Sequence, residues 1–530
     1  MSLLQEQLYS SFQTHKNLEA LSTQGKTYTY QNILDYAAAL NLGMNHNTQE
    51  SVSILGDRSL TAYAGVACCL FSGKTFVPIN PSFAPKQNQT VLDLSGCKTL
   101  IFDLKSWKTV KAVIADIETP LLLITLDAEN DSNQKTSEIR DFLNQTEHSL
   151  YVASIGGNDA YTISNVPDPH LLYVLFTSGT TGVPKGVPIS HNNVEHYLSG
   201  LNELLDLSSD DRFSQTFDLT FDLSMHDIFL SWITGGCLCV PASLELLAPK
   251  KYIEREGITI WFSVPSLAVL MKQLKLLESD SYSNIRYSLF CGEAFSASLA
   301  QKWQSAAPNS TVINLYGPTE ATIAFTYYEY SDTPKDYCNG LLPIGKAFGR
   351  NQTALYDLSS NHITQGEGEL CLAGEQLTQG YINNNKQNEE RFFTDDETNI
   401  RWYRTGDRVN YTDTGGYIFL GRIDHQVKIS GYRVELAEIE NILREISGCE
   451  HAVAVPSEFA DGCAQTLVAF VTKPNISLDE IKKRCKTELP KYKQPSTIYP
   501  LDTMPLNSNG KIDRNKLKDY LEEGKQCPKS

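Results

Sequence analysis

Residues 171–186 read LLYVLFTSGTTGVPKG, an apolar strand that runs directly into a turn rich in glycine and hydroxyl residues. The glycines let the backbone turn tightly and expose its N–H groups, while the hydroxyls add donors and Lys185 adds a positive charge. Such a turn can hold a polyphosphate. It is not a Walker A loop, because it lacks GK[ST]. Such a triplet occurs at Gly73-Lys74-Thr75, but Cys68 stands there in place of the first glycine of that pattern.

The segments before this turn predict a parallel α/β sheet. Residues 51–57 indicate a strand, residues 60–72 an apolar helix that ends near Gly73, and residues 75–81 a second strand. Strand, helix and strand in succession are typical of a parallel arrangement. Three later apolar strands end in small or polar residues, where ligands contact α/β sheets; they are expected at 258–265, 287–292 and 311–317.

The pattern changes toward the C-terminus. Short strands separated by turns begin near residue 351 and predict a β-rich subdomain. From about residue 425 a small α+β unit is expected, beginning with one continuous strand, VKISGYRV, at 427–434. Elsewhere, residues 3–13 predict a short amphipathic helix, and the polar residues 127–147 a surface helix or loop.

Composition narrows the functional class. The chain has 530 residues, of which 41% are hydrophobic and 20% charged, as in globular enzymes of several domains. A net charge of −17 makes it a poor general partner for nucleic acid or anionic membranes. The 12 cysteines form no CxxC, which argues against a metal cluster or redox motif. With no apolar segment near ~20 residues and no leader-like N-terminus, a cytoplasmic location is expected.

Seven motifs in order resemble those of the adenylate-forming superfamily, which includes acyl-CoA synthetases, luciferases and amino-acid adenylation domains. The turn at 175–186 is one. The others are TYTY at 27–30, NLYGPTE at 314–320, GEGEL at 366–370, YRTGD at 403–407, GRIDHQVK at 421–428 and NGKID at 509–513. The resemblance covers residues 5–520.

The resemblance implies an α/β fold in two unequal domains. Residues 1–423 would form a large domain of stacked α/β sheets with a β-rich subdomain. Residues 424–530 would form a small, mobile α+β domain, with a hinge at Asp424. This domain carries Lys511, which in the family contacts the substrate carboxylate and the α-phosphate. A cation placed there stabilises charge that builds on the phosphoryl oxygens.

The nucleotide site follows from individual residue chemistry and from the resemblance. Tyr316 offers a flat face for a purine, Asp407 can accept hydrogen bonds from ribose hydroxyls, and Glu320 can hold Mg²⁺. Arg422 resembles a second ribose contact. The expected ATP-binding residues are Thr177, Ser178, Gly179, Thr180, Thr181, Lys185, Gly292, Glu293, Ala294, Asn314, Leu315, Tyr316, Gly317, Pro318, Thr319, Asp407, Phe419, Arg422 and Lys511. The expected catalytic residues are Lys511, Thr181 and Glu320.

The substrate is predicted to be a small amino acid. Asp222 matches the family position that pairs with an α-ammonium group, and a buried carboxylate needs such a partner. The alternative is that Asp222 only caps the following helix. The pattern match predicts ten substrate-binding residues. Two are charged, Asp222 and Lys511, and the other eight are mostly apolar: Leu223, His226, Phe262, Leu289, Cys291, Leu315, Ile323 and Ala324. Among these eight residues His226 is the exception, because its imidazole is polar, and it could point away from the pocket.

Two kinds of free-standing enzyme fit this pocket. It is similar to prolyl-AMP ligases and to D-alanine–carrier protein ligases, and the bulk of Phe262 and Leu315 favours L-proline over D-alanine. The expected acceptor is the phosphopantetheine thiol of a separate carrier protein, because no carrier or condensation motif is present. An acyl-CoA synthetase and a catalytically silent binding protein are the alternatives. Asp222 argues against the first, and the intact Lys185, Glu320, Asp407 and Lys511 argue against the second.

Overall fold

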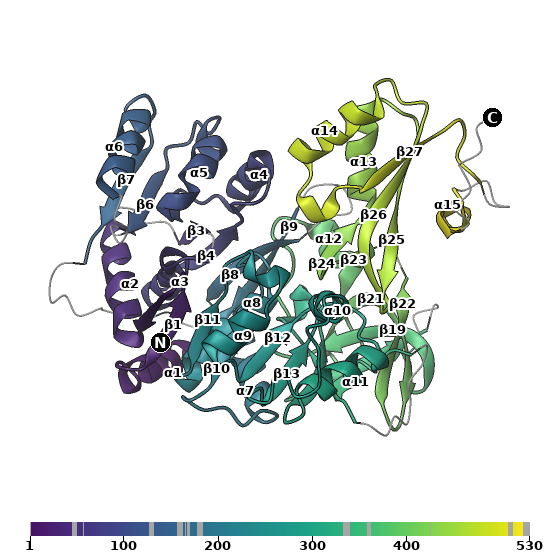
Figure 1. Cartoon of the computed structure of the whole chain (residues 1–530), viewed down its shortest axis with the longest axis horizontal. Helices are drawn as coiled ribbons and strands as arrows, with labels where there is room; N and C mark the ends of the chain where they lie inside the picture. Colours follow the sequence, from purple (N-terminus) through teal and green to yellow (C-terminus); the bar gives the residue numbers. More distant parts are fainter. Residues whose placement is uncertain are drawn as a thin grey trace.

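The computed structural model describes residues 2–44, 50–56, 58–126, 132–155, 163–164, 166, 170–177, 184–331, 340–357, 362–423, 426–506 and 512–522. Two α/β sheets and an antiparallel sheet form a large domain, and the last hundred residues form a small domain at one end of it (Figure 1). The predicted fold class is confirmed.

The first sheet contains the strand before the glycine-rich turn. Its order is β7(Ser149–Ala153), β6(Leu122–Leu126), β5(Thr99–Phe102), β3(Ser51–Leu55), β4(Thr75–Ile79), β8(Leu171–Thr177) and β9(Lys185–Ser190). Its strands are parallel except β9, which pairs antiparallel with β8, so Thr177 and Lys185 face each other across the turn. The predicted helix is α3(Leu60–Ser72), buried along its whole length. Gly73 ends it at φ 68°, a left-handed conformation that glycine adopts without steric cost.

The second sheet carries the substrate-side residues. Its order is β16(Lys346–Ala347), β15(Thr326–Glu329), β14(Thr311–Tyr316), β13(Tyr287–Phe290), β12(Ile260–Ser263), β10(Arg212–Ser214), β11(Cys237–Val240), β1(Glu19–Thr23) and β2(Lys26–Thr29). Strands β12, β13 and β14 are parallel, so Cys291, Gly292 and Gly317 follow them at one edge. This is where α/β sheets place ligands.

Helices cover both α/β sheets. One group packs into the largest apolar core: α1(Leu3–Thr14), α2(Tyr30–Met44), α7(His191–Asn202) and α8(Leu223–Thr234). The others of the large domain are α4(Pro85–Ser95), α5(Trp107–Ile114), α6(Ser132–Leu143), α9(Lys250–Glu256), α10(Pro265–Gln273), α11(Ala297–Ala306) and α12(Asn385–Arg391). Helices α1 and α6 confirm the predictions for residues 3–13 and 127–147.

The β-rich subdomain is antiparallel. It contains β17(Gln352–Tyr356), β18(His362–Ile363), β19(Gly366–Ala373), β20(Phe392–Thr394), β21(Arg401–Thr412) and β22(Gly416–Arg422). In the β21–β22 pair, Asp407 lies directly opposite Arg422.

The small domain begins with a hairpin. The prediction of one continuous strand over 427–434 is wrong, because β23(Gln426–Ile429) and β24(Tyr432–Glu435) pair antiparallel around Ser430 and Gly431. Both turn residues have positive φ, 49° and 84°, as a two-residue hairpin turn requires. The rest comprises α13(Leu436–Ser447), β25(Ala452–Ala460), β26(Cys463–Thr472), α14(Leu478–Glu488), β27(Thr497–Leu501) and α15(Arg514–Glu522).

Direct contacts fix the small domain against the large one. Lys272 of α10 pairs with Asp461 at the β25–β26 turn, with Nζ 2.9 Å from Oδ1. The hydroxyl of Tyr432 donates to Asp218 Oδ2 over 2.7 Å. Asp424 lies outside the described residues, so the hinge and the domain boundary stay predictions. In the ranges given above, no helix has both the length and the apolar character to cross a bilayer.

Candidate active site

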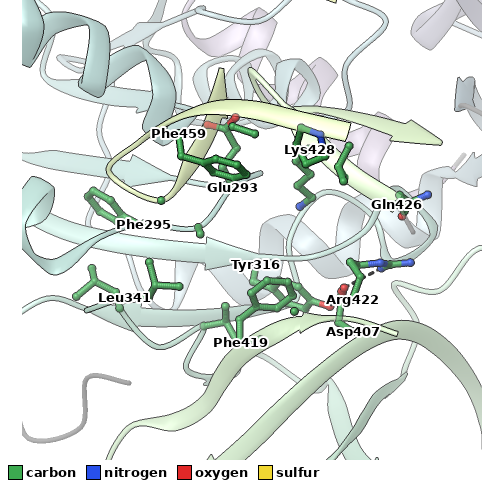
Figure 2. Close-up of a pocket in the computed structure, with 18 of the residues that line it drawn as sticks. Glu293, Phe295, Tyr316, Leu341, Asp407, Phe419, Arg422, Gln426, Lys428 and Phe459 are labelled. Atoms are coloured by element: carbon green, nitrogen blue, oxygen red, sulfur yellow. Dashed lines mark hydrogen bonds and ion pairs between the residues drawn. The ribbon is translucent and has the colours of Figure 1, made fainter. Parts of the chain in front are cut away.

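A cavity of about 440 Å³ lies between the two domains and is lined by seven of the predicted nucleotide residues. Figure 2 shows Tyr316, Phe419, Asp407 and Arg422 along one wall and Phe459 of the small domain on the other. Glu293, Ala294 and Asn314 also line it, as predicted. Segments far apart in the sequence thus provide one site with aromatic, carboxylate and guanidinium groups.

Asp407 is the centre of a hydrogen-bond network at the end of this cavity. It is buried and accepts hydrogen bonds from the Tyr316 hydroxyl and from Arg422 Nη1, the latter over 2.7 Å. Burial, together with the nearby Asp407 charge, raises the pKa of the Tyr316 phenol well above its usual value. These two contacts hold the Asp407 carboxylate in place at the cavity wall.

Two predicted nucleotide residues also have structural roles. Glu293 accepts hydrogen bonds from the backbone N–H of Ser266, over 2.8 Å, and of Gly431, over 2.6 Å. Its carboxylate therefore joins α10 to the β23–β24 turn. Asn314 donates to the Pro343 carbonyl over 2.8 Å.

Of the glycine-rich turn predicted to bind phosphate, the structure describes only the residues at its two ends. Thr177 and Lys185 end and begin the paired strands, whereas Ser178, Gly179, Thr180 and Thr181 lie outside the described residues. Lys185 Nζ donates to Gln387 Oε1 over 2.9 Å and lies 5.5 Å from the centre of the Tyr381 ring. Burial lowers the pKa of its ammonium group.

Glu320, the expected Mg²⁺ ligand, forms a buried ion pair with Arg433 of the small domain. Arg433 Nη1 lies 3.0 and 2.9 Å from the two carboxylate oxygens, and the Tyr381 hydroxyl donates over 2.7 Å. Burial alone would raise the pKa of Glu320, but the Arg433 charge and the Tyr381 hydroxyl hold it at about 2. One carboxylate fits a Mg²⁺ that takes its other ligands from phosphate and water. In this arrangement, however, Arg433 neutralises that carboxylate.

Asp222 borders a cavity of about 50 Å³ next to the nucleotide site. It occupies the N-cap position of α8, yet its side chain makes no capping hydrogen bond, so the alternative role is not supported. Burial raises the pKa of its carboxyl group to about 6, although the Thr319 hydroxyl and the Lys428 charge oppose the rise. An ammonium group would provide the partner that this carboxylate lacks.

Three of the predicted pocket residues line this cavity: Asp222, Leu223 and Cys291. The other six are buried and do not line it, with exposed fractions of 0–2%: His226, Phe262, Leu289, Leu315, Ile323 and Ala324. Lys511 lies outside the described residues.

Sequence reasoning missed several site residues from the small domain. Arg433 is one, and Lys428 is another, lining both the nucleotide cavity and the Asp222 cavity. No local pattern in the sequence singles out Arg433, because its contact with Glu320 depends on how the small domain docks on the large one.

A separate pocket of about 340 Å³, called the channel below, lies beside the hairpin turn. It is lined by Phe217 and Phe221, by Val264, Leu267 and Leu270 of the α10 region, and by Ser430 and Tyr432. A Cβ atom on Gly431 would lie 2.4 Å from Val264 Cγ1, so only glycine fits this turn in its docked position.

Comparison with known proteins agrees with this geometry. Residues 8–382 match the AMP-binding enzyme family model, and residues 438–511 match the AMP-binding enzyme C-terminal domain. D-alanine–D-alanyl carrier protein ligase of Lacticaseibacillus rhamnosus is 30% identical over 531 residues, covering 95% of this chain and 96% of the relative. Surfactin synthase subunit 1 of Bacillus subtilis (strain 168) is 30% identical over 95% of this chain, which spans 13% of that longer protein.

A solved structure extends the likeness to three dimensions. The Vibrio cholerae adenylation domain AlmE, in complex with glycyl-adenosine-5'-phosphate, superposes with a TM-score of 0.90 at 32% identity, with 98% of each chain covered. The resemblance inferred from the motifs is confirmed. The chain belongs to the AMP-binding enzyme family, within the adenylate-forming superfamily.

Proposed function

We propose that this protein activates a small amino acid with ATP and Mg²⁺, and passes the aminoacyl group to a phosphopantetheine thiol on a separate carrier protein. In the first step the amino-acid carboxylate attacks the α-phosphorus, an aminoacyl-adenylate forms and pyrophosphate leaves. The observation that carries this proposal is the buried Asp222 carboxylate, which forms no ion pair with any residue that the structure describes and borders a small cavity beside the nucleotide site.

The surrounding residues support the chemistry of that step. Lys428 places positive charge between the Asp222 and nucleotide cavities, where the adenylate phosphate would lie. Glu320 would hold Mg²⁺, which neutralises phosphate charge. Lys511 would stabilise the charge that develops on the α-phosphate. Because Arg433 now pairs with Glu320, we assign this arrangement to the second step, with the small domain turned from its position in the first.

The channel beside the hairpin suits the acceptor. Its apolar residues, among them Phe221, Val264 and Leu270, would pack against a slender pantetheine arm that reaches the adenylate from outside. A structural relative, PA1221, is an NRPS protein containing adenylation and PCP domains, and it resembles this chain at 22% identity. An acyl-CoA synthetase remains the second candidate, which Asp222 disfavours.

ATP–pyrophosphate exchange tests the proposal. Exchange is expected with L-proline, D-alanine or glycine, which differ in the room that they need beyond Asp222. Pattern matching favours L-proline, whereas AlmE was solved with a glycyl-adenylate. Exchange that depends on fatty or aryl acids, and not on any amino acid, would contradict the proposed function.

The pKa of Asp222 predicts a pH dependence. The ionised carboxylate binds the substrate ammonium, and the empty site has a pKa of about 6. Below pH 6 the proton competes with the amino acid, so kcat/KM for the amino acid should fall about tenfold per pH unit. Above pH 7 it should be flat. Measuring kcat/KM for ATP at saturating amino acid gives the control, since a similar fall there would assign the pH effect to another group.

Replacing Arg433 should separate the two half-reactions. The R433M variant keeps the length of the side chain but leaves Glu320 unpaired in the arrangement described here, and breaking a buried pair costs ~3–5 kcal/mol. Exchange should persist, while aminoacyl transfer from synthetic adenylate to free pantetheine should fall at least ~100-fold. The matched control is K272A, which breaks the partly exposed pair with Asp461 and should change transfer less than about fivefold. Equal losses in both variants would refute the special role of Arg433.

A further inference from the structure

The side-chain pocket behind Asp222 is filled by protein. The 50 Å³ cavity is lined by Asp222, Leu223 and Cys291. Most of the other residues that line it belong to the nucleotide site or to the β23–β24 hairpin. A second cavity at Asp222, of about 80 Å³, opens toward Thr177 and Arg433 at the phosphate end. Neither cavity is lined by the six deeper specificity residues, which pack against one another in the largest core or, for His226, beside it.

His226 provides most of this filling. It follows Asp222 by four residues, and residues four apart share a face of a helix, so its imidazole lies on the substrate side of α8. Its ring centre is 4.2 Å from that of Phe262, and both side chains have an exposed fraction of 0%. The imidazole and the phenyl ring thus occupy the space into which an amino-acid side chain would extend.

Tyr197 of α7 holds the imidazole in this position. The Tyr197 hydroxyl and His226 Nδ1 share a hydrogen bond of 2.6 Å, and the Tyr197 ring packs edge-on against Phe348 at 6.0 Å. Burial lowers the pKa of His226 to about 3, so the ring is neutral at ordinary pH. A neutral, hydrogen-bonded and fully packed imidazole has few other rotamers available.

We infer that Tyr197, His226 and Phe262 close the side-chain pocket and make glycine the substrate, with Tyr197 acting as a positioning residue. This inference rests on the proposed function. The cavity of about 50 Å³ that Asp222 lines does not reach His226 or Phe262, whose rings pack against each other. The substrate's ammonium group and α-carbon fill that space, and a methyl group or a pyrrolidine ring would have to displace the imidazole.

The first test is ATP–pyrophosphate exchange by the wild-type protein with glycine, L-alanine, D-alanine and L-proline. Glycine should exceed each of the others at least about tenfold in kcat/KM, because one methylene that does not fit changes specificity by about 10- to 200-fold. Equal or better exchange with alanine or proline overturns the inference and leaves the proposed function standing. Exchange with no amino acid overturns both.

Two variants test the residues. H226A should raise the alanine-to-glycine ratio of kcat/KM at least about tenfold. Y197F keeps the packing but removes the hydroxyl, and should raise this ratio severalfold. The matched control is Y173F, since the equally buried Tyr173 hydroxyl has no hydrogen-bond partner among the described residues. If H226A fails to fold, Y197F decides; an unchanged ratio in folded Y197F overturns the positioning role.

Discussion

Replacing Asp222 with alanine is expected to abolish amino-acid-dependent pyrophosphate exchange while ATP binding stays close to wild type. The carboxylate is buried, makes no capping hydrogen bond and borders the proposed ammonium site. Removing one partner of a buried charge pair costs ~2–5 kcal/mol, which corresponds to a loss of roughly 30- to 5,000-fold in kcat/KM. Exchange kinetics measure the first quantity, and titration calorimetry with ATP measures the second.

The same helix offers a matched control. Asp227 lies further along α8, is fully buried, and both its carboxylate oxygens lack hydrogen-bond partners in the described part of the chain. Burial raises the pKa of Asp227 well above its usual value, which favours the uncharged form of this carboxyl group. The D227N variant should therefore retain nearly full exchange. Near-normal exchange in D222A, or equal losses in the two variants, would refute the ammonium-binding role.

Local pattern predicted most of the elements correctly because their signals are local. Helix α3 has an apolar surface all round, a serine before it and a glycine after it, and each feature acts within one turn of chain. The hairpin at Ser430 was missed for a physical reason. Its two strands have only four residues each, too few for either to show its own period clearly, although Ser430-Gly431 shifts the apolar alternation by one residue.

Part of the cavity between the domains follows from local pattern. Tyr316 ends the parallel strand β14 at the edge where α/β sheets place ligands, while Asp407 and Arg422 face each other on adjacent antiparallel strands. Contacts between the domains were not predictable in this way. The Arg433–Glu320 pair and the Gly431–Glu293 hydrogen bond depend on where one domain docks on the other, which no periodicity encodes.

For the predicted side-chain pocket, the sequence is limited in another way. Pattern matching predicts which residues line the pocket, but the volume of the pocket depends on the conformations of their side chains. His226 was expected either to line the pocket or to point away from it. The hydrogen bond to Tyr197, a residue 29 positions earlier in the chain, settles the ring position, and with it the room left for substrate.

Lys511→Ala is expected to slow adenylate formation far more than aminoacyl transfer. The ammonium group would contact the attacking carboxylate and the α-phosphate, and its attraction grows as charge concentrates on the phosphoryl oxygens. Loss of a comparable electrostatic donor costs ~10²–10³ in rate. Transfer begins from the finished adenylate, in the arrangement where Arg433 rather than Mg²⁺ neutralises Glu320. Supplying synthetic aminoacyl-adenylate should therefore restore transfer to pantetheine in this variant.

The control for this experiment is K516A, a more exposed lysine of the same C-terminal segment, whose ammonium group lies 3.8 Å from Asp513 Oδ2. Surface pairs of this kind contribute ~0–1 kcal/mol, so both half-reactions should remain within about fivefold of wild type. Failure of the adenylate to rescue K511A, in a protein that melts at the wild-type temperature, would mean that Lys511 serves both steps. Rescue would mean that Lys511 serves adenylate formation and is not needed for transfer.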